Sequence, residues 1–154
     1  MNHWIFPSSW SKFDLLGAFA ALHELDWRKN CTAKSGDIAF MYLGAPVQKI
    51  VVKAAVIADD VPATPGSTID DRAFSKVPRT EYQQELADTP TFLRLSVLAC
   101  YVHLNSELSF AALRNNGLTS NLQGPLLLKN NKQLCDYIMA IEGDREPSST
   151  SRSR

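Results

Sequence analysis

Flat aromatic side chains are the residues of this sequence that could do chemistry, and the chemistry they suit is binding rather than catalysis. The chain contains three tryptophans, Trp4, Trp10 and Trp27, and Tyr42 stands near the end of an apolar run. A nucleobase that leaves its stack is held by rings against its faces and by hydrogen bonds at its edge. Each ring contributes about 1–3 kcal/mol, so two rings offset the few kcal/mol that unstacking costs. These residues therefore predict a pocket that can hold one base.

Each aromatic residue also has an ordinary structural explanation. Trp4 lies in an apolar segment, where packing in the core is favoured over a role in a pocket. Trp27 follows a predicted helix, and its ring could instead plug the open end of a small barrel. Tyr42 shares a strand face with apolar residues, which favours burial, although its place at the strand end also suits a pocket mouth. Trp10 lies in a polar loop, where it could be a lid, a partner contact or a cover over the helix.

Short polar side chains and accessible backbone are the candidates for contacts at the edge of the base. Ser8 and Ser9 follow the first predicted strand, and Gln123 precedes an apolar run near the end of the chain. Gly44 and Ala45 are small enough for a ligand to approach the backbone. Turn chemistry explains these positions equally well. Four cations are placed by sequence to meet phosphates, although each is of a type common on any surface: Arg28, Lys29, Lys49 and Arg114.

No group of residues has the spacing of a catalytic or metal site. The histidines at positions 3, 23 and 103 are far apart, and none has a Cys, Asp or Glu at ligand spacing. The sequence contains no G-x-S-x-G motif and no phosphate-binding loop. Asp59 and Asp60 could hold Mg²⁺ in principle, but a solvated strand end is the commoner meaning of such a pair. We therefore expect a recognition domain that is not an enzyme and that uses neither a metal nor a cofactor.

Composition and charge bound the class of protein. The 154 residues fit one domain. Equal numbers of basic and acidic residues, 16 each, argue against a general polyanion binder, whose affinity grows with its cationic contacts. Taking one base into a pocket needs fewer such contacts. The three cysteines have no C-x-x-C spacing and indicate reduced thiols. No apolar run reaches the ~18 residues that a membrane span needs, so we expect a cytoplasmic protein that does not contact membranes.

Two central strands, residues 38–43 and 50–57, are the elements around which the rest must be arranged. Gly44-Ala45-Pro46 forms a tight connection between them, and the first strand is apolar on both of its faces, as expected for burial on two sides. Before them the sequence predicts a short strand from residue 3 that Pro7 halts, and an amphipathic helix over residues 12–25. After them it predicts a long connection over residues 61–88 with one helical turn near 81–86, a strand at 92–104, a helix at 109–114 ended by Gly117, an apolar segment at 126–128, and a helix at 131–141.

The central stretch also carries a family resemblance. The sequence from Gly36 to Val56, with the pattern G-D-I-x-F-x-Y-L-G-A-P, resembles the core of EVE-type domains of the PUA superfamily, to which YTH domains are related. Three further pieces agree in order, so that the match spans about residues 3–142: Trp4–Ser9, Leu25–Arg28, and Asn116–Leu118 with Gln123–Pro125. The sequence supports an α+β domain over residues 1–145, with a small, strongly curved mixed sheet or partly closed barrel flanked by helices, and the resemblance implies that this fold is of the EVE/PUA type. A polar tail or linker over residues 146–154 would follow.

The same resemblance implies a function. EVE-like domains often stand at the N-terminus of modification-dependent restriction systems, so the chain would bind a flipped methylated or hydroxymethylated base in DNA, such as 5-methylcytosine. Trp27 would be the wall of the pocket, and a fused or partner nuclease would do the cutting. Ser8 and Ser9 align with a Lys-Ser pair of YTH domains, although look-alikes often carry Asn there, and Gln123 belongs to the closing motif. The alternatives are a YTH-like reader of RNA and a module for a small ligand or a protein. A basic rim around Trp27 would favour binding of nucleic acid. An acidic or apolar rim would favour a module for a small ligand or a protein.

Overall fold

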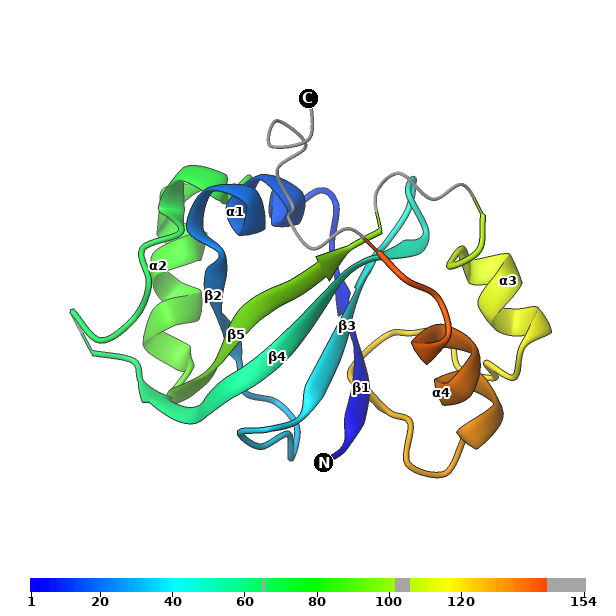
Figure 1. Ribbon diagram of the computed structural model, residues 1–154. Coiled ribbons are helices and arrows are strands. Elements are labelled where there is room, and N and C mark those ends of the chain that lie inside the picture. Colours follow the sequence, from blue (N-terminus) through cyan, green and yellow to red (C-terminus); the bar gives the residue numbers. More distant parts are fainter. Residues whose placement is uncertain (65, 102–105, 144–154) are drawn as a thin grey trace, which may run out of the picture.

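The computed structural model describes residues 1–64, 66–101 and 106–143, and within them the chain forms a curved sheet with helices on both faces (Figure 1). The elements in chain order are β1 (His3–Ser8), α1 (Leu15–Leu22), β2 (Glu24–Arg28), β3 (Ile38–Leu43), β4 (Lys49–Pro62), the 3-10 turn η1 (Arg72–Phe74), α2 (Arg79–Asp88), β5 (Thr91–Cys100), α3 (Phe110–Asn115), β6 (Leu126–Leu127) and α4 (Lys132–Met139). His103 and the predicted tail at 146–154 lie outside the described residues. No helix in the described ranges is both long and apolar enough to cross a membrane.

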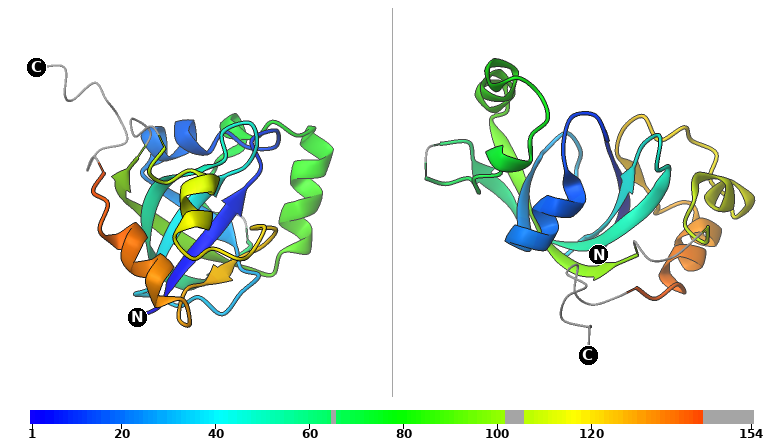
Figure 2. Two further views of the ribbon diagram at one scale, coloured as in Figure 1. Left: turned by 90° about the vertical axis from the view of Figure 1, so that its right-hand side faces the viewer. Right: turned by 90° about the horizontal axis from the view of Figure 1, so that it is seen from above.

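The sheet has the strand order β2-β5-β4-β3-β1-β6. β1 runs parallel to β3, and every other neighbouring pair is antiparallel, so the sheet is mixed as expected. Figure 2 shows the strong bend of the strands. Among the described residues, β2 and β6 do not pair with each other, so the sheet stays open at both edges and is not closed into a barrel.

The two predicted central strands are present, and the second is longer than expected. β3 has the predicted bounds, whereas β4 continues through Asp59 and Asp60 to Pro62. The pair Asp59-Asp60 and the change of composition beyond it suggested a strand end, but β5 supplies a partner up to the pair Pro62–Thr91. Register shifts between β4 and β5 interrupt this ladder, and such irregularities bend and twist a strand.

Pro7 does not halt the first strand, which was a wrong prediction. It lies inside β1, opposite Tyr42 of β3. The Ser8 carbonyl accepts a hydrogen bond from the Gly44 amide at 3.0 Å, so Ser8 directs its backbone polar groups toward β3. Alternation then directs the nitrogen of Pro7 to the opposite side. The short strand β6 pairs only with Trp4 and Ile5, so no ladder bond is lost at the proline.

The first helix is shorter than predicted, and this moves Trp27 into the sheet. The Asp14 side chain accepts a hydrogen bond from the Gly17 amide at 3.1 Å and caps α1, and His23 ends the helix with a left-handed φ of 64°. Leu25 therefore belongs to β2 and not to the helix. Its spacing from the preceding apolar residues suits a helix, but the same side chain also points inward from a strand. Trp27 follows two residues later on the same face of β2.

Two hydrophobic clusters lie on opposite faces of the sheet. The first contains Trp4, Phe6 and Met41 from the strands together with Leu15 and Phe19 of α1. The second cluster contains the strand residues of alternate parity, with side chains from α3 and α4 closing over them: Ile5, Phe40, Tyr42, Ile50, Leu113, Leu134 and Ile138. β1 and β3 are thus buried on both faces, as the sequence predicted for residues 38–43. The division also decides which of the candidate aromatic residues can meet.

Candidate functional site

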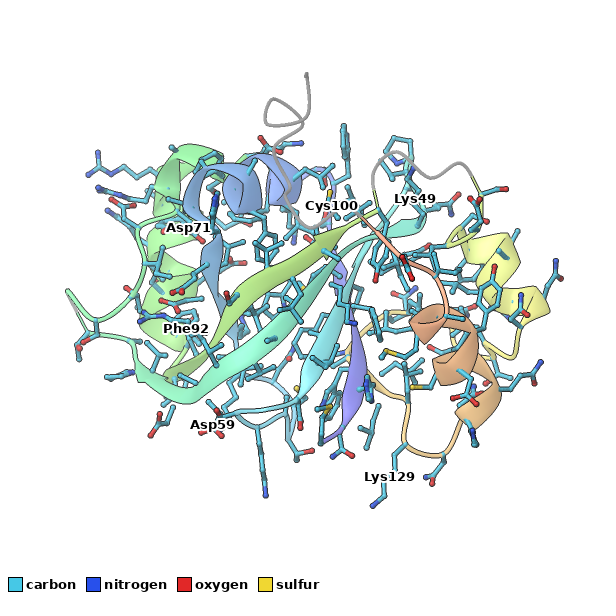
Figure 3. The ribbon with its side chains drawn as sticks, viewed as in Figure 1. Lys49, Asp59, Asp71, Phe92, Cys100 and Lys129 are labelled. Atoms are coloured by element: carbon cyan, nitrogen blue, oxygen red, sulfur yellow. The ribbon has the colours of Figure 1, made fainter. Side chains whose placement is uncertain are left out.

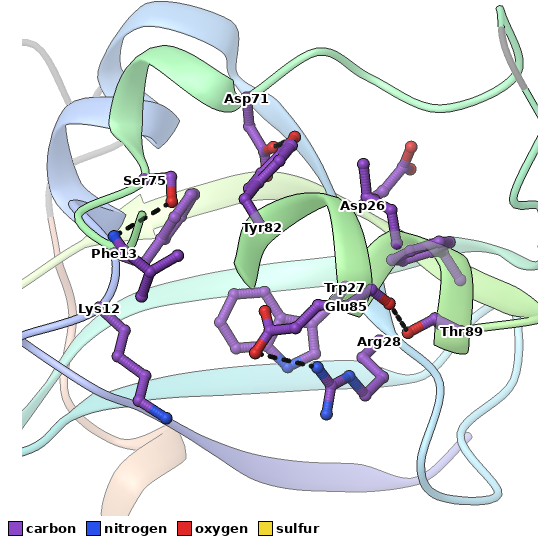
Figure 4. Close-up of a pocket in the computed structure, with 13 residues that line it drawn as sticks. Lys12, Phe13, Asp26, Trp27, Arg28, Asp71, Ser75, Tyr82, Glu85 and Thr89 are labelled. Carbon is purple, nitrogen blue, oxygen red and sulfur yellow. Dashed lines mark hydrogen bonds and ion pairs between the residues drawn. The ribbon is translucent and has the colours of Figure 1, made fainter. Parts of the chain in front are cut away.

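A cavity of about 200 Å³ lies between β2 and α2 (Figure 4). Aromatic side chains from four separate segments line it: Phe13 before α1, Trp27 of β2, Tyr82 of α2 and Phe92 of β5. Apolar side chains from the long connection complete the lining with Val77 and Leu86. The Trp27 ring is half-buried, packing against the first hydrophobic cluster and also lining the cavity. Trp27, which the family resemblance implies to be the wall of a pocket, thus lines a cavity in the structure.

A hydrogen-bonded carboxylate supplies the main polar group of the cavity. The Tyr82 hydroxyl donates to Oδ1 of Asp71 at 2.6 Å. Burial raises the pKa of Asp71 above its ordinary value, and the hydrogen bond from Tyr82 opposes that rise. Burial and the same bond raise the pKa of the Tyr82 hydroxyl, which therefore remains a donor at neutral pH. A carboxylate has more acceptor positions than this one bond uses, so Asp71 can accept a further hydrogen bond from a ligand.

Most of the other charged groups of the cavity have partners within the protein. Arg28 forms an ion pair with Glu85 of α2, with Nη2 and Oε1 3.4 Å apart (Figure 4). The Asp26 carboxylate, only 5% exposed, accepts two hydrogen bonds from Arg94 at 2.8 and 3.0 Å. Lys12 is the lining cation without a side-chain partner among the described residues. The rim is therefore of mixed and largely compensated charge, neither basic nor acidic.

Backbone pairing attaches the long connection to the start of α1. The Asp14 amide donates to the Phe74 carbonyl at 2.7 Å, and the Lys76 amide donates to the Lys12 carbonyl at 2.8 Å. The Lys76 ammonium in turn donates to the Trp10 carbonyl at 2.8 Å and lies 4.2 Å from the centre of the Trp10 ring. Trp10 is 42% exposed. Since Lys76 stands between two cavity-lining residues, Trp10 is coupled to the rim without lining the cavity.

The structure does not bring the other two aromatic candidates to this cavity. Trp4 is buried in the first cluster, and its indole nitrogen donates to the buried Asp37 carboxylate at 3.0 Å. Burial alone would raise the pKa of Asp37, but hydrogen bonds from Asn2, Lys34 and Trp4 together lower it. Tyr42 lies in the second cluster on the opposite face, and burial raises the pKa of its hydroxyl. Trp4 therefore has a structural role, and Tyr42 cannot face a base held against Trp27.

The candidates for edge contacts lie at the end of β1 and beyond it. Ser8 and Gly44 meet through the backbone hydrogen bond already described, with Ala45 following in a cis peptide bond to Pro46. The Ser9 and Ser11 hydroxyls are 3.1 Å apart and exposed. None of these residues lines the cavity. Gln123 is exposed in the loop between α3 and β6 and does not line the cavity.

The four candidate phosphate contacts are dispersed over the molecule. Arg28 lines the cavity, where Glu85 pairs with it. The Lys29 ammonium donates to the Asp59 carbonyl at 2.7 Å. Lys49 lies near α3, bridged to Ser109, and Figure 3 places it far from Asp71 and Phe92. Arg114 of α3 donates to Asn121 and lies over the Phe110 ring. The structure thus does not assemble them into one basic patch.

Sequence reasoning missed the residues that the long connection and β5 contribute to the cavity. Asp71 and Tyr82 come from a stretch expected to be irregular except for one turn, yet α2 spans ten residues, from Arg79 to Asp88. The available signal was the presence of two aromatic residues, Phe74 and Tyr82, in a segment without apolar periodicity. No group of three or more His, Cys, Asp or Glu in the described residues is placed to hold a metal ion.

The fold is similar to that of solved ASCH structures. The crystal structure of ASCH from Zymomonas mobilis matches with a TM-score of 0.61 and 12% identity, covering 92% of this chain and 96% of that chain. A tyrosine-to-phenylalanine mutant of that protein matches with a TM-score of 0.61 and 10% identity, over 93% of this chain and 100% of that chain. Protein Atu2648 from Agrobacterium tumefaciens has a TM-score of 0.53 and 13% identity, with coverages of 91% and 92%.

These likenesses show that the chain has a PUA-like fold, related to that of EVE domains. The fold that the resemblance implies is thereby confirmed in outline. No protein-family model and no curated protein sequence matches the chain. The resemblance to EVE-type domains in particular therefore rests on the sequence motifs.

Proposed function

We propose that this chain is a nucleic-acid recognition domain that takes one nucleobase into the cavity between β2 and α2. The observation that carries the proposal is the half-buried Trp27 ring, which walls a cavity of about 200 Å³ with three further aromatic residues around it. Pockets for drug-sized ligands measure about 300–1,000 Å³. The smaller volume suits a single flat ring system. Aromatic faces stack on any base, and the PUA-like fold supports the choice of nucleic acid over other flat ligands.

Asp71 is the group proposed to read the edge of the base. A carboxylate accepts a hydrogen bond from the exocyclic amino group of cytosine, and by the same chemistry from that of adenine. The hydroxyl of Tyr82 holds Oδ1 of Asp71 at 2.6 Å and so limits the orientations of the carboxylate. Uracil and thymine present a carbonyl oxygen at the corresponding position, which Asp71 would repel. We therefore expect an amino-bearing base.

The finer proposal is that the base is modified and belongs to DNA. Val77 and Leu86 give the cavity an apolar side, and burying one methyl group against such a surface is worth about 0.8 kcal/mol. The resemblance to EVE domains supports a methylated or hydroxymethylated cytosine that is flipped out of a duplex. The domain would then recognise without cutting, and a nuclease in another domain or partner would act on the marked site. The alternative is a base of single-stranded RNA, which needs no flipping.

The compensated charge of the rim agrees with binding through the base rather than through many phosphates. Arg28 and Asp26, which line the cavity, both have partners within the protein. Each phosphate contact adds about 0.7–0.9 to the slope of affinity against salt on a logarithmic scale. We therefore expect a shallow salt dependence for the whole protein.

The test is binding to matched duplexes that differ in one base: cytosine, 5-methylcytosine, 5-hydroxymethylcytosine, N4-methylcytosine, adenine or N6-methyladenine, with single-stranded RNA counterparts. Trp27→Ala should weaken binding to the preferred ligand by about 1–3 kcal/mol, because it removes a stacking surface. Phe110→Ala is the matched control, since it truncates a half-buried ring on the opposite face of the sheet. Thermal unfolding of both variants separates loss of the pocket from loss of the fold.

A preference for one modified duplex that Trp27→Ala abolishes and Phe110→Ala retains would support the finer proposal. Tighter binding to RNA with the same response to Trp27→Ala would keep the pocket and change the polymer. Absence of binding to every ligand at low salt, by a folded protein, would overturn nucleic-acid recognition.

A further inference from the structure

A second cavity, of about 500 Å³, adjoins the proposed base pocket. The two cavities share Ser75, Val77 and Tyr82 as lining residues, so these side chains form the partition between them. Arg72 of η1 and Arg79 in the first turn of α2 also line the second cavity. A ligand held against Tyr82 in the first cavity therefore has a second hollow directly beside it.

The charges of the second cavity leave one cation available. Arg72 donates to both oxygens of Asp70, from Nε at 2.9 Å and from Nη2 at 2.7 Å, so this pair is neutral as a unit. Arg72 holds the pKa of the Asp70 carboxyl well below its usual range, at about 2, so the carboxylate beside Arg72 is ionised at neutral pH. Arg79 has no ion pair or side-chain hydrogen bond within the described ranges. The second cavity thus carries one uncompensated positive charge, in contrast to the paired arginine of the first cavity.

We propose that the second cavity is the subsite for the phosphate next to the bound base, with Arg79 as its contact. This inference rests on the proposed function, because it assumes that a base occupies the first cavity. A base is joined to its phosphates through one sugar, so a base against Trp27 and Tyr82 brings a phosphate to the partition. An arginine guanidinium presents parallel N–H donors that match two phosphate oxygens. The ligand would then be a nucleotide within a strand rather than a free base.

The test uses a graded series of ligands with the full chain: a nucleoside, its 5′-monophosphate, its 3′-monophosphate and a tetranucleotide. The series is built on 5-methyl-2′-deoxycytidine and on N6-methyladenosine. Arg79→Gln removes the proposed contact, and Arg79→Lys keeps the charge while removing the planar fork. Lys129→Gln is the control, because it removes one exposed positive charge beyond β6, far from Asp71 (Figure 3).

Arg79→Gln is expected to weaken binding of one monophosphate and of the tetranucleotide about tenfold, as for the loss of a charged hydrogen bond. Binding of the nucleoside should not change, and Arg79→Lys should recover only part of the loss. For the tetranucleotide, the salt slope should fall by about 0.7, which corresponds to one phosphate on a single strand. Lys129→Gln should leave every affinity unchanged.

Two results would overturn the subsite. If Arg79→Gln binds all ligands as the unaltered protein does, the phosphate lies elsewhere, while the loss caused by Trp27→Ala would still support the base pocket. If Arg79→Gln weakens the nucleoside as much as the nucleotides, Arg79 acts on the pocket and not on phosphate. Failure of the unaltered protein to bind any member of either series would instead remove the proposed function and the subsite together.

Discussion

The two faces of the sheet carry similar numbers of large apolar side chains, but helices pack on them differently, and the cavity described above lies on the face toward α2. On the opposite face, α3 and α4 insert Leu113, Leu134 and Ile138, each fully buried, between the strand side chains. α2 has no fully buried residue in its described length and meets β2 across the cavity through an ion pair. A helix with an apolar stripe closes on a sheet, whereas a mainly polar helix held at its rim leaves room for a ligand.

The largest expected effect tests this difference in packing. Ile138→Ala in α4 should reduce the free energy of unfolding by about 2–5 kcal/mol, because it leaves a hole in a close-packed cluster. Leu86→Ala in α2 should cost about 1 kcal/mol or less, since its side chain is only half-buried beside an existing cavity. Alanine favours the helix in both variants, so the difference reports packing. Urea unfolding measures it, and equal costs for the two substitutions would contradict the contrast between the faces.

The same contrast explains how much of the molecule could be predicted. β3 and α4 were predicted nearly to their observed bounds, because burial on a sheet or under a helix imposes a period on the apolar residues. The α1–β2 boundary was misplaced, because Leu25 satisfies a helical and a strand period alike and the left-handed His23 between them left no clear signal. α2 was expected as one turn only, because it lacks an apolar stripe.

The candidate site was predictable only in part for a related reason. Trp27 was identified through the family motif, and it does line the cavity. Tyr42 and Trp4 are aromatic like Trp27, but they are buried in the two hydrophobic clusters. Strand alternation places Tyr42 in the second cluster, and a hydrogen bond to a buried carboxylate holds Trp4 in the first. Asp71 and Tyr82 come from a segment whose sequence has no helical or strand periodicity. Only the hydrogen bond between them in the folded structure shows that they form a pair.

An intermediate effect concerns the Asp71–Tyr82 pair on the open face. Tyr82→Phe removes the donor that favours the ionised carboxylate, so the pKa of Asp71, already raised by burial, should rise further. We expect a loss of about 0.5–1.5 kcal/mol in binding of an amino-bearing base. The affinity should also decline on acidification at a higher pH than in the unaltered protein, because the protonated carboxyl accepts less well. Asp71→Asn is the control, and its affinity should not titrate in this range.

The pH dependence of stability should have the opposite sign to that of affinity: acidification should weaken binding of the base but increase the contribution of Asp71 to the free energy of unfolding. Since the folded-state pKa lies above the ordinary value of 3.8, the folded protein binds more protons than the unfolded chain between the two values. The contribution of Asp71 to the free energy of unfolding therefore falls as pH rises through that window and is constant above it. Asp71→Asn should remove this fall, as measured by urea unfolding at a series of acid pH values. An identical pH dependence in the unaltered protein and in Asp71→Asn would contradict the raised pKa.

The smallest expected effect on stability comes from breaking the ion pair that links α2 to β2, and it tests whether α2 is held less firmly than α4. Arg28→Gln breaks the ion pair to Glu85, in which both side chains are about half exposed, so the free energy of unfolding should change by less than about 1 kcal/mol. Lys132→Gln is the matched control, because it breaks the exposed pair Lys132–Asp136 on α4. Rates of amide hydrogen exchange should differ between the two variants even if their free energies of unfolding are the same. Amides of α2 should exchange faster in Arg28→Gln, whereas those of α4 should be unaffected in Lys132→Gln, because Ile138 anchors that helix.

Salt provides an independent check on the same contact, because an exposed pair is screened within about 3 Å at 1 M. High salt should accelerate exchange in α2 of the unaltered protein and have little further effect in Arg28→Gln. If α2 exchanges at the same rate in both proteins at low salt, the ion pair does not hold the helix over the cavity. The half-buried Leu86 and Tyr82 would then be its main anchors, and α2 would be a fixed wall. If exchange accelerates as expected, the wall of the cavity opposite Trp27 can open at small cost, which is what entry of a base requires.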